Sequence, residues 1–265
     1  MHDSFYETTQ IYPWLYRICD QLNSNVYLIL GNEKALLFDS GNGLEPIMPI
    51  ISSITRLPVE IILSHGHIDH AGGSYLFDSV WLHEKDKTLC LRHTGKTAKR
   101  GIITKMQNSG VAPPRAFDEE SYIHSGTGNI KAVEAGQVFN LAGLTAEIIS
   151  LSGHTQGSVG VLVHESRVLF TGDAIIPNAL VFMDESTSVS EYIAMLERTI
   201  LMDFDTFYCA HVQRGLPKSL IKSFISVAKN IDLKNTTPFT RFLPELGGLV
   251  YAEKDVSIAF RPDKL

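Results

Sequence analysis

Residues 64–73 read S-H-G-H-I-D-H-A-G-G and carry most of the chemistry that the sequence reveals. Four potential metal ligands lie within six positions: His65, His67, Asp69 and His70. The run follows residues 59–63, a short apolar, β-branched stretch that is typical of a buried strand. Alternate residues at a strand end can direct His65 and His67 toward one point, and the next turn can direct Asp69 and His70 toward a neighbouring point. Imidazole and carboxylate groups suit zinc, and also iron or manganese.

Three further candidates occupy the same kind of position, directly after a predicted strand. They are His154 after residues 144–151, Asp173 after residues 167–171 and His211 after residues 206–210. A small residue near each lets the backbone approach a crowded centre. Each alone would more often be an ordinary loop residue, so the repetition at four strand ends favours a metal site. The five other histidines receive no site role, although His93 lies near the insertion described below: His2, His83, His93, His124 and His164.

Asp39 follows another strand-like stretch, residues 34–38. It can be a direct ligand, a carboxylate that orients a ligating histidine, or a turn-forming residue. We favour the orienting role, because such carboxylates fix the tautomer of histidines that bind metal.

The elements that must position these residues follow from hydrophobic periodicity. Strand-like stretches occupy residues 14–19, 25–30, 34–38, 59–63, 80–83, 137–140, 144–151, 158–164, 167–171 and 206–210. Helical patterns occupy residues 44–54, 70–77, 84–91, 190–202 and 217–231, and residues 249–251 and 256–260 form a terminal hairpin. Strands followed by strand–helix alternation, twice over, predict an α/β fold: a four-layer αβ/βα sandwich of two mixed β-sheets flanked by helices. We expect a single domain over residues 1–265.

Residues 92–130 interrupt this pattern. The segment is rich in Gly, Ser and Thr, contains Pro113-Pro114, and predicts a lid or cap insertion over the site. Its first part contains five basic residues and no acid: Arg92, Lys96, Lys99, Arg100 and Lys105. These can receive an anionic part of a substrate or form a solvated helix face. Residues 174–183, after Asp173, are apolar enough to line a pocket.

Composition excludes several classes of protein. The 265 residues are 44% hydrophobic and 20% charged, as in globular chains, and the formal net charge of −6 argues against a nucleic-acid partner. No apolar run approaches the ~20 residues of a membrane helix, and the first residues do not form a signal peptide. Cys19, Cys90 and Cys209 are widely separated, which predicts free thiols in a reducing compartment. We therefore expect a cytoplasmic enzyme without a membrane partner.

The ordered set of motifs resembles the metallo-β-lactamase-fold hydrolases, over residues of about 11–260. The motifs that carry the resemblance are Asp39, H-x-H-x-D-H at residues 65–70, His154, Asp173 and His211. The resemblance implies two divalent metal ions with a hydroxide between them. The first ion would take His65, His67 and His154. The second would take Asp69, His70 and His211, and Asp173 would bridge both.

Residues 151–158 (L-S-G-H-T-Q-G-S) and 170–173 (F-T-G-D) look like the glyoxalase II branch of this family. His70 disfavours β-lactamase activity, because antibiotic-hydrolysing branches usually lack a histidine there. Two departures put glutathione thioesters in doubt. Ala210 and Val212 flank His211 where many relatives have glycines, and only 54 residues follow His211. Glyoxalase II has a helical glutathione-binding domain at that end.

The predicted function is a dinuclear metal-dependent hydrolase that attacks a small ester, thioester or lactone with the bridging hydroxide. Asp69 and Asp173 are the expected catalytic residues, and the substrate is a small molecule with a possible anionic group. Zinc is the expected metal, with manganese or iron as alternatives. Three other functions remain open: a phosphodiesterase with the same centre, an iron-dependent redox enzyme similar to sulfur dioxygenases, and a non-catalytic binding scaffold.

Overall fold

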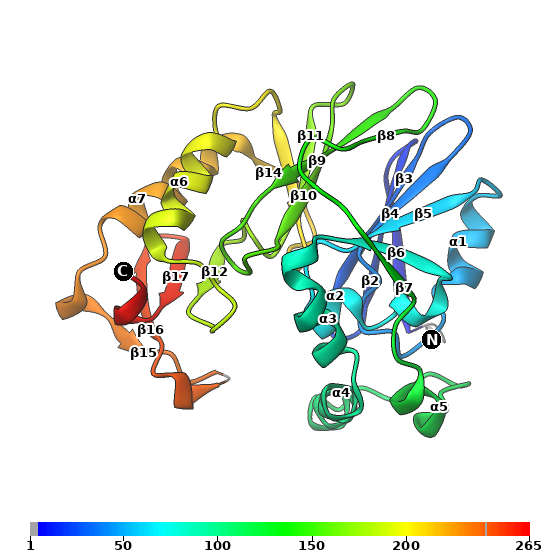
Figure 1. The fold of residues 1–265 in the computed structure, drawn as a ribbon, viewed down its shortest axis with the longest axis horizontal. Coiled ribbons are helices and arrows are strands. Elements are labelled where there is room, and N and C mark those ends of the chain that lie inside the picture. The colour runs from blue at the N-terminus through cyan, green and yellow to red at the C-terminus, as the bar shows by residue number, and fades with distance from the viewer. Residues whose placement is uncertain (1–4, 242) are drawn as a thin grey trace.

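The computed structural model describes residues 5–241 and 243–265, and its first sheet is built mainly from the N-terminal half of the chain (Figure 1). Its strands in spatial order are β1 (Tyr6–Tyr12), β2 (Leu15–Asp20), β3 (Asn25–Leu30), β4 (Ala35–Phe38), β5 (Val59–Ile62), β6 (Ser79–Leu82) and β7 (Asn129–Ala132). Strands β1 to β4 form an antiparallel meander, whereas β4 to β7 run parallel. The sheet is therefore mixed, as predicted.

The second sheet has six strands and is also mixed. Their spatial order is β14 (Leu216–Pro217), β13 (Thr206–Cys209), β11 (Val168–Gly172), β10 (Val159–Val163), β9 (Thr145–Ser150) and β8 (Val138–Asn140). Strands β11 and β13 are parallel neighbours, while the other pairs are antiparallel. The carboxyl ends of β11 and β13 therefore lie at one edge, where Asp173 and His211 follow them.

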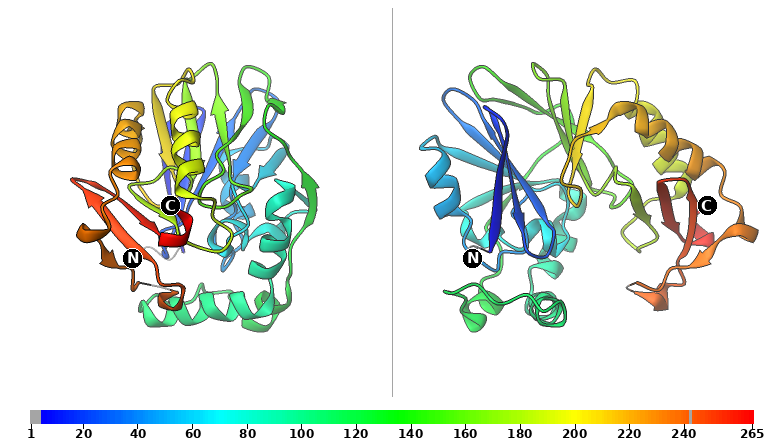
Figure 2. Two further views of the ribbon diagram at one scale, coloured as in Figure 1. Left: turned by 60° about the vertical axis from the view of Figure 1, so that its left-hand side comes forward. Right: turned by 180° about the vertical axis from the view of Figure 1, so that it is seen from behind.

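Helices cover the outer faces of the two large sheets and complete four layers (Figures 1 and 2). On the first sheet lie α1 (Met48–Ile54), α2 (Ile68–Ala71), α3 (Lys87–His93), α4 (Lys96–Asn108) and α5 (Glu119–His124). On the second lie α6 (Val189–Thr199) and α7 (Ile221–Lys229). Between the sheets, Tyr27, Phe38, Phe170 and Tyr208 form a buried aromatic cluster. The predicted αβ/βα sandwich is confirmed.

A small third sheet, which the sequence did not indicate, packs beside the second. It consists of β12 (Asn178–Val181), β17 (Val256–Phe260), β16 (Leu249–Glu253) and β15 (Thr237–Pro238). Strands β16 and β17 are the predicted terminal hairpin. Strand β12 pairs with β17 across about 80 residues of sequence, a long-range pairing that local patterns do not reveal.

Two predicted helices differ from the structure. The pattern at residues 70–77 is divided into α2 and a 3₁₀ turn at Ser74–Leu76, because Gly72-Gly73 disfavours a continuous helix. The pattern at residues 84–91 begins as a 3₁₀ turn, Glu84–Asp86, before α3. No helix among the described residues is long and apolar enough to cross a bilayer. All three cysteines are buried free thiols.

Candidate metal centre

All seven predicted ligands lie together at one edge of the paired sheets. His65, His67, Asp69 and His70 follow β5, His154 follows β9, Asp173 follows β11 and His211 follows β13. The two sheets face each other, so the loops after these four strands meet in space. Five of the seven residues are at least nine-tenths buried: His65, His67, His70, His154 and Asp173.

The first group contains three histidines whose ring nitrogens converge. His67 Nδ1 lies 3.0 Å from His65 Nε2 and 3.0 Å from His154 Nε2. Ligand atoms around a tetrahedral zinc ion are separated by about 3.3 Å, given Zn–N bonds of about 2.0–2.1 Å. These three nitrogens can therefore hold one ion with small adjustments.

The second group lies beside the first and contains Asp69, His70 and His211. His211 Nε2 lies 3.4 Å from Asp69 Oδ2 and 3.3 Å from Asp173 Oδ1. The other oxygen of Asp173 faces the first group, 3.8 Å from His154 Nε2. The Asp173 carboxylate thus lies between the groups, where the resemblance expects a bridge.

Two buried atoms at the centre support a fit to metal. Neither His70 Nε2 nor Asp173 Oδ1 has a hydrogen-bond partner among the described residues. A buried polar atom left unpaired costs about 1–3 kcal/mol, and metal ligation would remove that cost.

The outward nitrogen of each of the five histidines is held by a partner. His70 Nδ1 lies 2.8 Å from Asp39 Oδ2, and His65 Nδ1 lies 2.9 Å from Ser64 Oγ. Backbone carbonyls accept from the other two Nδ1 atoms: Leu180 from His154 at 2.8 Å, and Asn23 from His211 at 2.7 Å. Such partners fix which nitrogen faces the centre, as in proteins that bind metal through histidine. Asp39 therefore stands where the orienting role requires.

The pKa shifts of the histidines differ between the first group and the second. Burial and the nearby His67 lower the pKa of His154 to about 4, so its lone pair is available at neutral pH. Burial and His70 likewise hold the pKa of His65 well below its usual value. His65 and His154 are therefore uncharged at neutral pH and can bind a cation.

In the second group, the carboxylates raise the pKa of His211 by more than burial lowers it. Burial lowers the pKa of His211, but Asp173 raises it to about 9. Burial also opposes ionisation of Asp173, yet His211 and His70 hold the pKa of that carboxyl well below its usual range. The second group thus contains negative charge that a metal ion would neutralise in place of protons.

Glu185 and His93 were not predicted, yet both lie at the site. Glu185 Oε1 is 2.8 Å from His67 Nε2, the outward nitrogen of that ring. The His93 ring lies 4.9 Å from the ring of His67, so the prediction that His93 has no place at the site is wrong. Neither residue follows a strand in a ligand-like pattern, so the sequence gave no signal for them beyond the position of His93 in the insertion.

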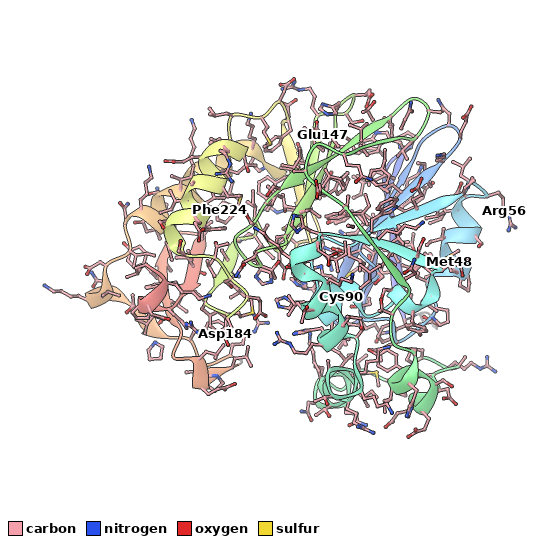
Figure 3. The ribbon with its side chains drawn as sticks, in the orientation of Figure 1. Met48, Arg56, Cys90, Glu147, Asp184 and Phe224 are labelled. Atoms are coloured by element: carbon pink, nitrogen blue, oxygen red, sulfur yellow. The ribbon has the colours of Figure 1, made fainter. Side chains whose placement is uncertain are left out.

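A pocket of about 480 Å³ opens onto this centre. His67, Asp69 and His154 form its floor, and its apolar walls are Ile68, Ile102, Leu180, Met183, Leu243 and Leu246. Arg92, Lys105, Asp184 and Glu185 bring charge to the pocket, and Arg92 lies 3.7 Å from the Glu185 carboxylate. Figure 3 labels Asp184 on the loop after β12 and Cys90 on α3, the helix that carries Arg92. The insertion therefore contributes to the pocket, as does the apolar loop after Asp173.

The five basic residues of the insertion do not all lie at the pocket: Arg92 and Lys105 line it, whereas the other three do not. Lys99 does not line the pocket: it is fully buried, and its ammonium lies over the rings of Tyr75 and Tyr122 at 4.7 and 4.9 Å. The expectation that all five basic residues can meet one anion is wrong for Lys99. The spacing of Lys99 with Ile102, Ile103 and Met106 along α4 could have shown that they share a face.

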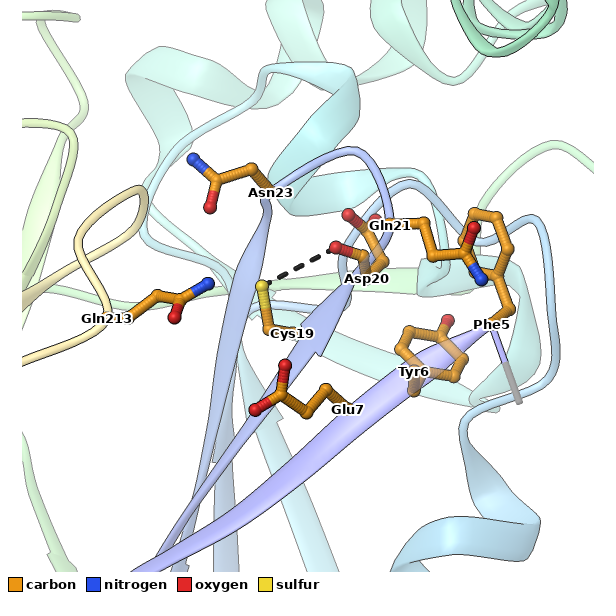
Figure 4. Close-up of a pocket in the computed structure, with 8 residues that line it drawn as sticks. All are labelled: Phe5, Tyr6, Glu7, Cys19, Asp20, Gln21, Asn23 and Gln213. Atoms are coloured by element: carbon orange, nitrogen blue, oxygen red, sulfur yellow. Dashed lines mark hydrogen bonds between the residues drawn. The ribbon is translucent and has the colours of Figure 1, made fainter. Parts of the chain in front are cut away.

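A second pocket, of about 340 Å³, lies beside β1 and β2 and is lined by Cys19, Asp20 and Gln213 among others (Figure 4). None of the seven predicted ligands lines it. Cys19 Sγ donates a weak hydrogen bond to the Asp20 carbonyl at 3.5 Å, and burial raises the pKa of that thiol to about 11. The thiol is therefore unreactive at neutral pH.

The chain is similar to several known proteins. Acyl-coenzyme A thioesterase MBLAC2 of Bos taurus is 24% identical over 212 residues, covering 75% of this chain and 71% of that protein. Hydroxyacylglutathione hydrolase GloC of Haemophilus influenzae is 29% identical over 163 residues, covering 59% and 68%. A metallo-beta-lactamase from Pontibacter korlensis shares the fold, with a TM-score of 0.56 at 18% identity over 85% of this chain and 100% of that chain. The model of the metallo-beta-lactamase superfamily matches residues 19–211. The chain belongs to the metallo-beta-lactamase superfamily.

Proposed function

We propose that this metal-dependent hydrolase is a thioesterase that cleaves acyl thioesters with two divalent ions, zinc being the expected metal and manganese or iron the alternatives. The observation that carries the proposal is the pocket beside the centre, which combines apolar walls with a basic rim. Its walls suit an acyl chain, and Arg92 and Lys105 suit an anionic thiol carrier. The similarity to an acyl-coenzyme A thioesterase and to a hydroxyacylglutathione hydrolase supports the same class of substrate.

The predicted ligands divide between the two ions. His65, His67 and His154 would hold the first, Asp69, His70 and His211 the second, and Asp173 both. When bound, the ions would lower the pKa of a shared water from about 15.7 toward about 7 and polarise the thioester carbonyl. Asp69 and Asp173 are the carboxylates placed to orient that water, and Asp39 keeps His70 directed inward.

The protonation of the pocket favours a thiolate leaving group. Burial and His67 lower the pKa of His93 to about 4. Burial opposes ionisation of Glu185, but its hydrogen bond with His67 lowers its pKa to about 2. Neither residue carries an acidic proton at neutral pH. A thiol ionises near a pKa of about 8.5, so a thiolate can depart without a general acid, whereas an alkoxide cannot.

We propose further that the insertion at about residues 92–130 serves as one wall and lid of the pocket. Helices α3 and α4 bring Arg92, His93, Ile102 and Lys105 to it. The opposite wall comes from Met183 and from the segment with Leu243 and Leu246, which lies at the same end of the molecule as α4 (Figure 2). An acyl chain would lie between these walls.

The test is a substrate panel on zinc-loaded protein: octanoyl-coenzyme A, the octanoyl thioester of N-acetylcysteamine, the octanoyl ester of ethanol, and bis(nitrophenyl) phosphate. We expect the highest kcat/KM for octanoyl-coenzyme A and about two bound zinc ions per chain. Asp173→Asn should lower bound zinc and kcat together, the latter by more than about 100-fold. Asp203→Asn, at an exposed carboxylate that lines neither pocket, is the matched control.

Other outcomes would replace the proposal. Faster cleavage of the phosphate diester would favour the phosphodiesterase. One iron per chain with oxygen consumption on a persulfide would favour the redox enzyme. Full thioesterase activity in Asp173→Asn would refute the ligand assignment.

A further inference from the structure

Asp86 is a buried carboxylate outside the predicted metal ligands, at the end of the 3₁₀ turn Glu84–Asp86 that precedes α3. Only 1% of the residue is exposed. Its Oδ2 accepts from Gly66 N at 2.9 Å and from Thr155 Oγ1 at 2.7 Å. Its Oδ1 accepts from Gly157 N at 2.9 Å. One side chain thus receives three hydrogen bonds from two different loops.

These two loops carry the whole first group of ligands. Gly66 lies between His65 and His67, and Thr155 directly follows His154. Hydrogen bonds to a carboxylate are about twice as strong as those between neutral groups. A backbone bond from Val159 N to Ser64 O, 2.8 Å long, joins the same loops nearby. Asp86 adds a connection through residues adjacent to His67 and His154.

The loops contain glycine where Asp86 comes closest. A Cβ on Gly157 would lie 2.4 Å from Asp86 Oδ1, and a Cβ on Gly66 would lie 2.9 Å from the Asp86 carbonyl. Both distances are shorter than non-bonded atoms tolerate. Gly157 therefore permits the close approach of the Asp86 carboxylate, and Gly66 permits the close approach of the Asp86 backbone to the other ligand loop.

We propose that Asp86 is a positioning residue that holds the loop of His65 and His67 against the loop of His154 and so sets the metal affinity of the first site. The inference rests on the proposed metal centre. Asp86 also directly precedes α3, the helix that brings Arg92 and His93 to the pocket. The same residue therefore connects the first site to that helix. In the sequence, Asp86 follows the strand-like stretch 80–83 but falls within the predicted helix 84–91, so it was not singled out as a site residue.

The test measures binding of Co²⁺ to chelator-treated protein by visible absorption, in two single-site backgrounds. His211→Ala reports the first site and His154→Ala reports the second. Asp86→Asn replaces one acceptor oxygen by an amide donor that faces a backbone N–H. We expect it to weaken Co²⁺ binding about 10- to 100-fold at the first site and to leave the second unchanged.

Asp20→Asn is the matched control. Asp20 is also buried, and its carboxylate accepts four hydrogen bonds, from Leu22 N, Ser24 N, Asn42 N and Asn42 Nδ2, none of them from a ligand loop. We expect Asp20→Asn to lower thermal stability without weakening the first site. An equal loss of first-site affinity in Asp20→Asn would assign the effect to general destabilisation and overturn the proposal.

A second variant keeps the test available if Asp86→Asn does not fold. Thr155→Val removes one hydrogen bond to Asp86, and Thr155→Ser keeps the hydroxyl. We expect Thr155→Val to weaken the first site and Thr155→Ser to restore it, with losses in Asp86→Asn and Thr155→Val that do not add in the double variant. Unchanged first-site affinity in Asp86→Asn or Thr155→Val overturns the inference. Absence of Co²⁺ binding in the wild-type chain would instead overturn the proposed metal centre.

Discussion

The histidines of the centre are defined as much by their outward nitrogens as by their inward ones. Each ring has one nitrogen directed to the centre and the other bound to a carboxylate, a hydroxyl or a carbonyl oxygen. A ring that is held in this way loses little freedom when it binds metal, so affinity depends on the partner as well as on the ligand. His67 depends on Glu185, a residue of the loop after β12.

Glu185 should therefore influence the first metal without touching it. We expect Glu185→Ala to lower zinc affinity about 10-fold or more, and Glu185→Gln to retain most of it, because the amide oxygen can still accept from His67 Nε2. Competition with a zinc-binding indicator measures both variants. Asp184→Asn, which removes a charge one position away, is the control. Wild-type affinity in Glu185→Ala would contradict the role.

The pKa of His211 makes the stability of metal-free protein depend on pH. Burial lowers that pKa and Asp173 raises it to about 9, above the usual value of about 6.5. Because the folded pKa is raised, protonated His211 stabilises the fold fully below about pH 6.5, and the stabilisation is lost as pH rises through about 9. His211 retains some exposure, so we expect about 2 kcal/mol rather than the full shift.

Urea unfolding of chelator-treated protein at pH 6.5 and pH 9.5 measures this loss. The His211→Ala variant should show a smaller fall between the same pH values. His154, whose pKa is lowered to about 4, should contribute nothing in this range. An equal fall in wild type and His211→Ala would show that other groups cause it.

Among the larger elements, α4 decides how the insertion meets the substrate. One face buries Lys99 against Tyr75 and Tyr122, and the edge with Ile102 and Lys105 reaches the pocket. A helix rotated by one residue would have placed different charges at the rim. The face that packs on the first sheet therefore fixes which basic residues a substrate can contact.

Arg92 and Lys105 should act on an anionic substrate through KM. We expect Arg92→Ala and Lys105→Ala each to raise KM for octanoyl-coenzyme A about 2- to 5-fold, because exposed charge pairs contribute about 0.2–1 kcal/mol. The uncharged N-acetylcysteamine thioester should be unaffected, and added salt should reduce the difference. Lys96→Ala and Arg100→Ala, exposed residues of α4 away from the pocket, are the controls. Equal effects on both thioesters would remove the proposed charge recognition.

At the scale of the whole molecule, the proposed metal centre needs both large sheets, because its residues follow strands of the first sheet and of the second. Phe170 lies between them, with ring centroids 5.1 Å from Tyr27, 6.1 Å from Phe38 and 5.8 Å from Tyr208. Phe170 belongs to β11, and Asp173 directly follows the end of that strand. The same packing that stabilises the fold therefore positions the carboxylate between the two groups of ligands.

Phe170→Ala should cost about 3–5 kcal/mol of unfolding free energy, since a buried aromatic side chain is lost and a cavity remains. Urea titration of the zinc-loaded protein measures the change. Leu201→Ala, at a side chain that is 84% exposed, should change the free energy by less than about 0.5 kcal/mol. Similar midpoints for the two variants would show that the inter-sheet cluster contributes little.

Local patterns were sufficient for most strands of the two-sheet sandwich, although they missed β1, β7, β12, β14 and β15, and they singled out the seven proposed ligands with Asp39. Each of these residues stands directly after a strand, and hydrophobic periodicity reveals where a buried strand ends. Residue type then indicates the chemistry, because a metal centre requires imidazole and carboxylate groups whatever surrounds them. The family and its metal-dependent hydrolase activity were therefore predictable from the order of these motifs.

Contacts between distant segments were not predictable in this way. Glu185 reaches His67 across 118 positions, Asp86 reaches Gly157 across 71, and β12 pairs with β17 near the end of the chain. No local pattern fixes such pairs, because they form only when packing brings the elements together. The sequence thus contained the reactive groups and their order, whereas tertiary packing selected the partners that orient them and the walls of the pocket in which they act.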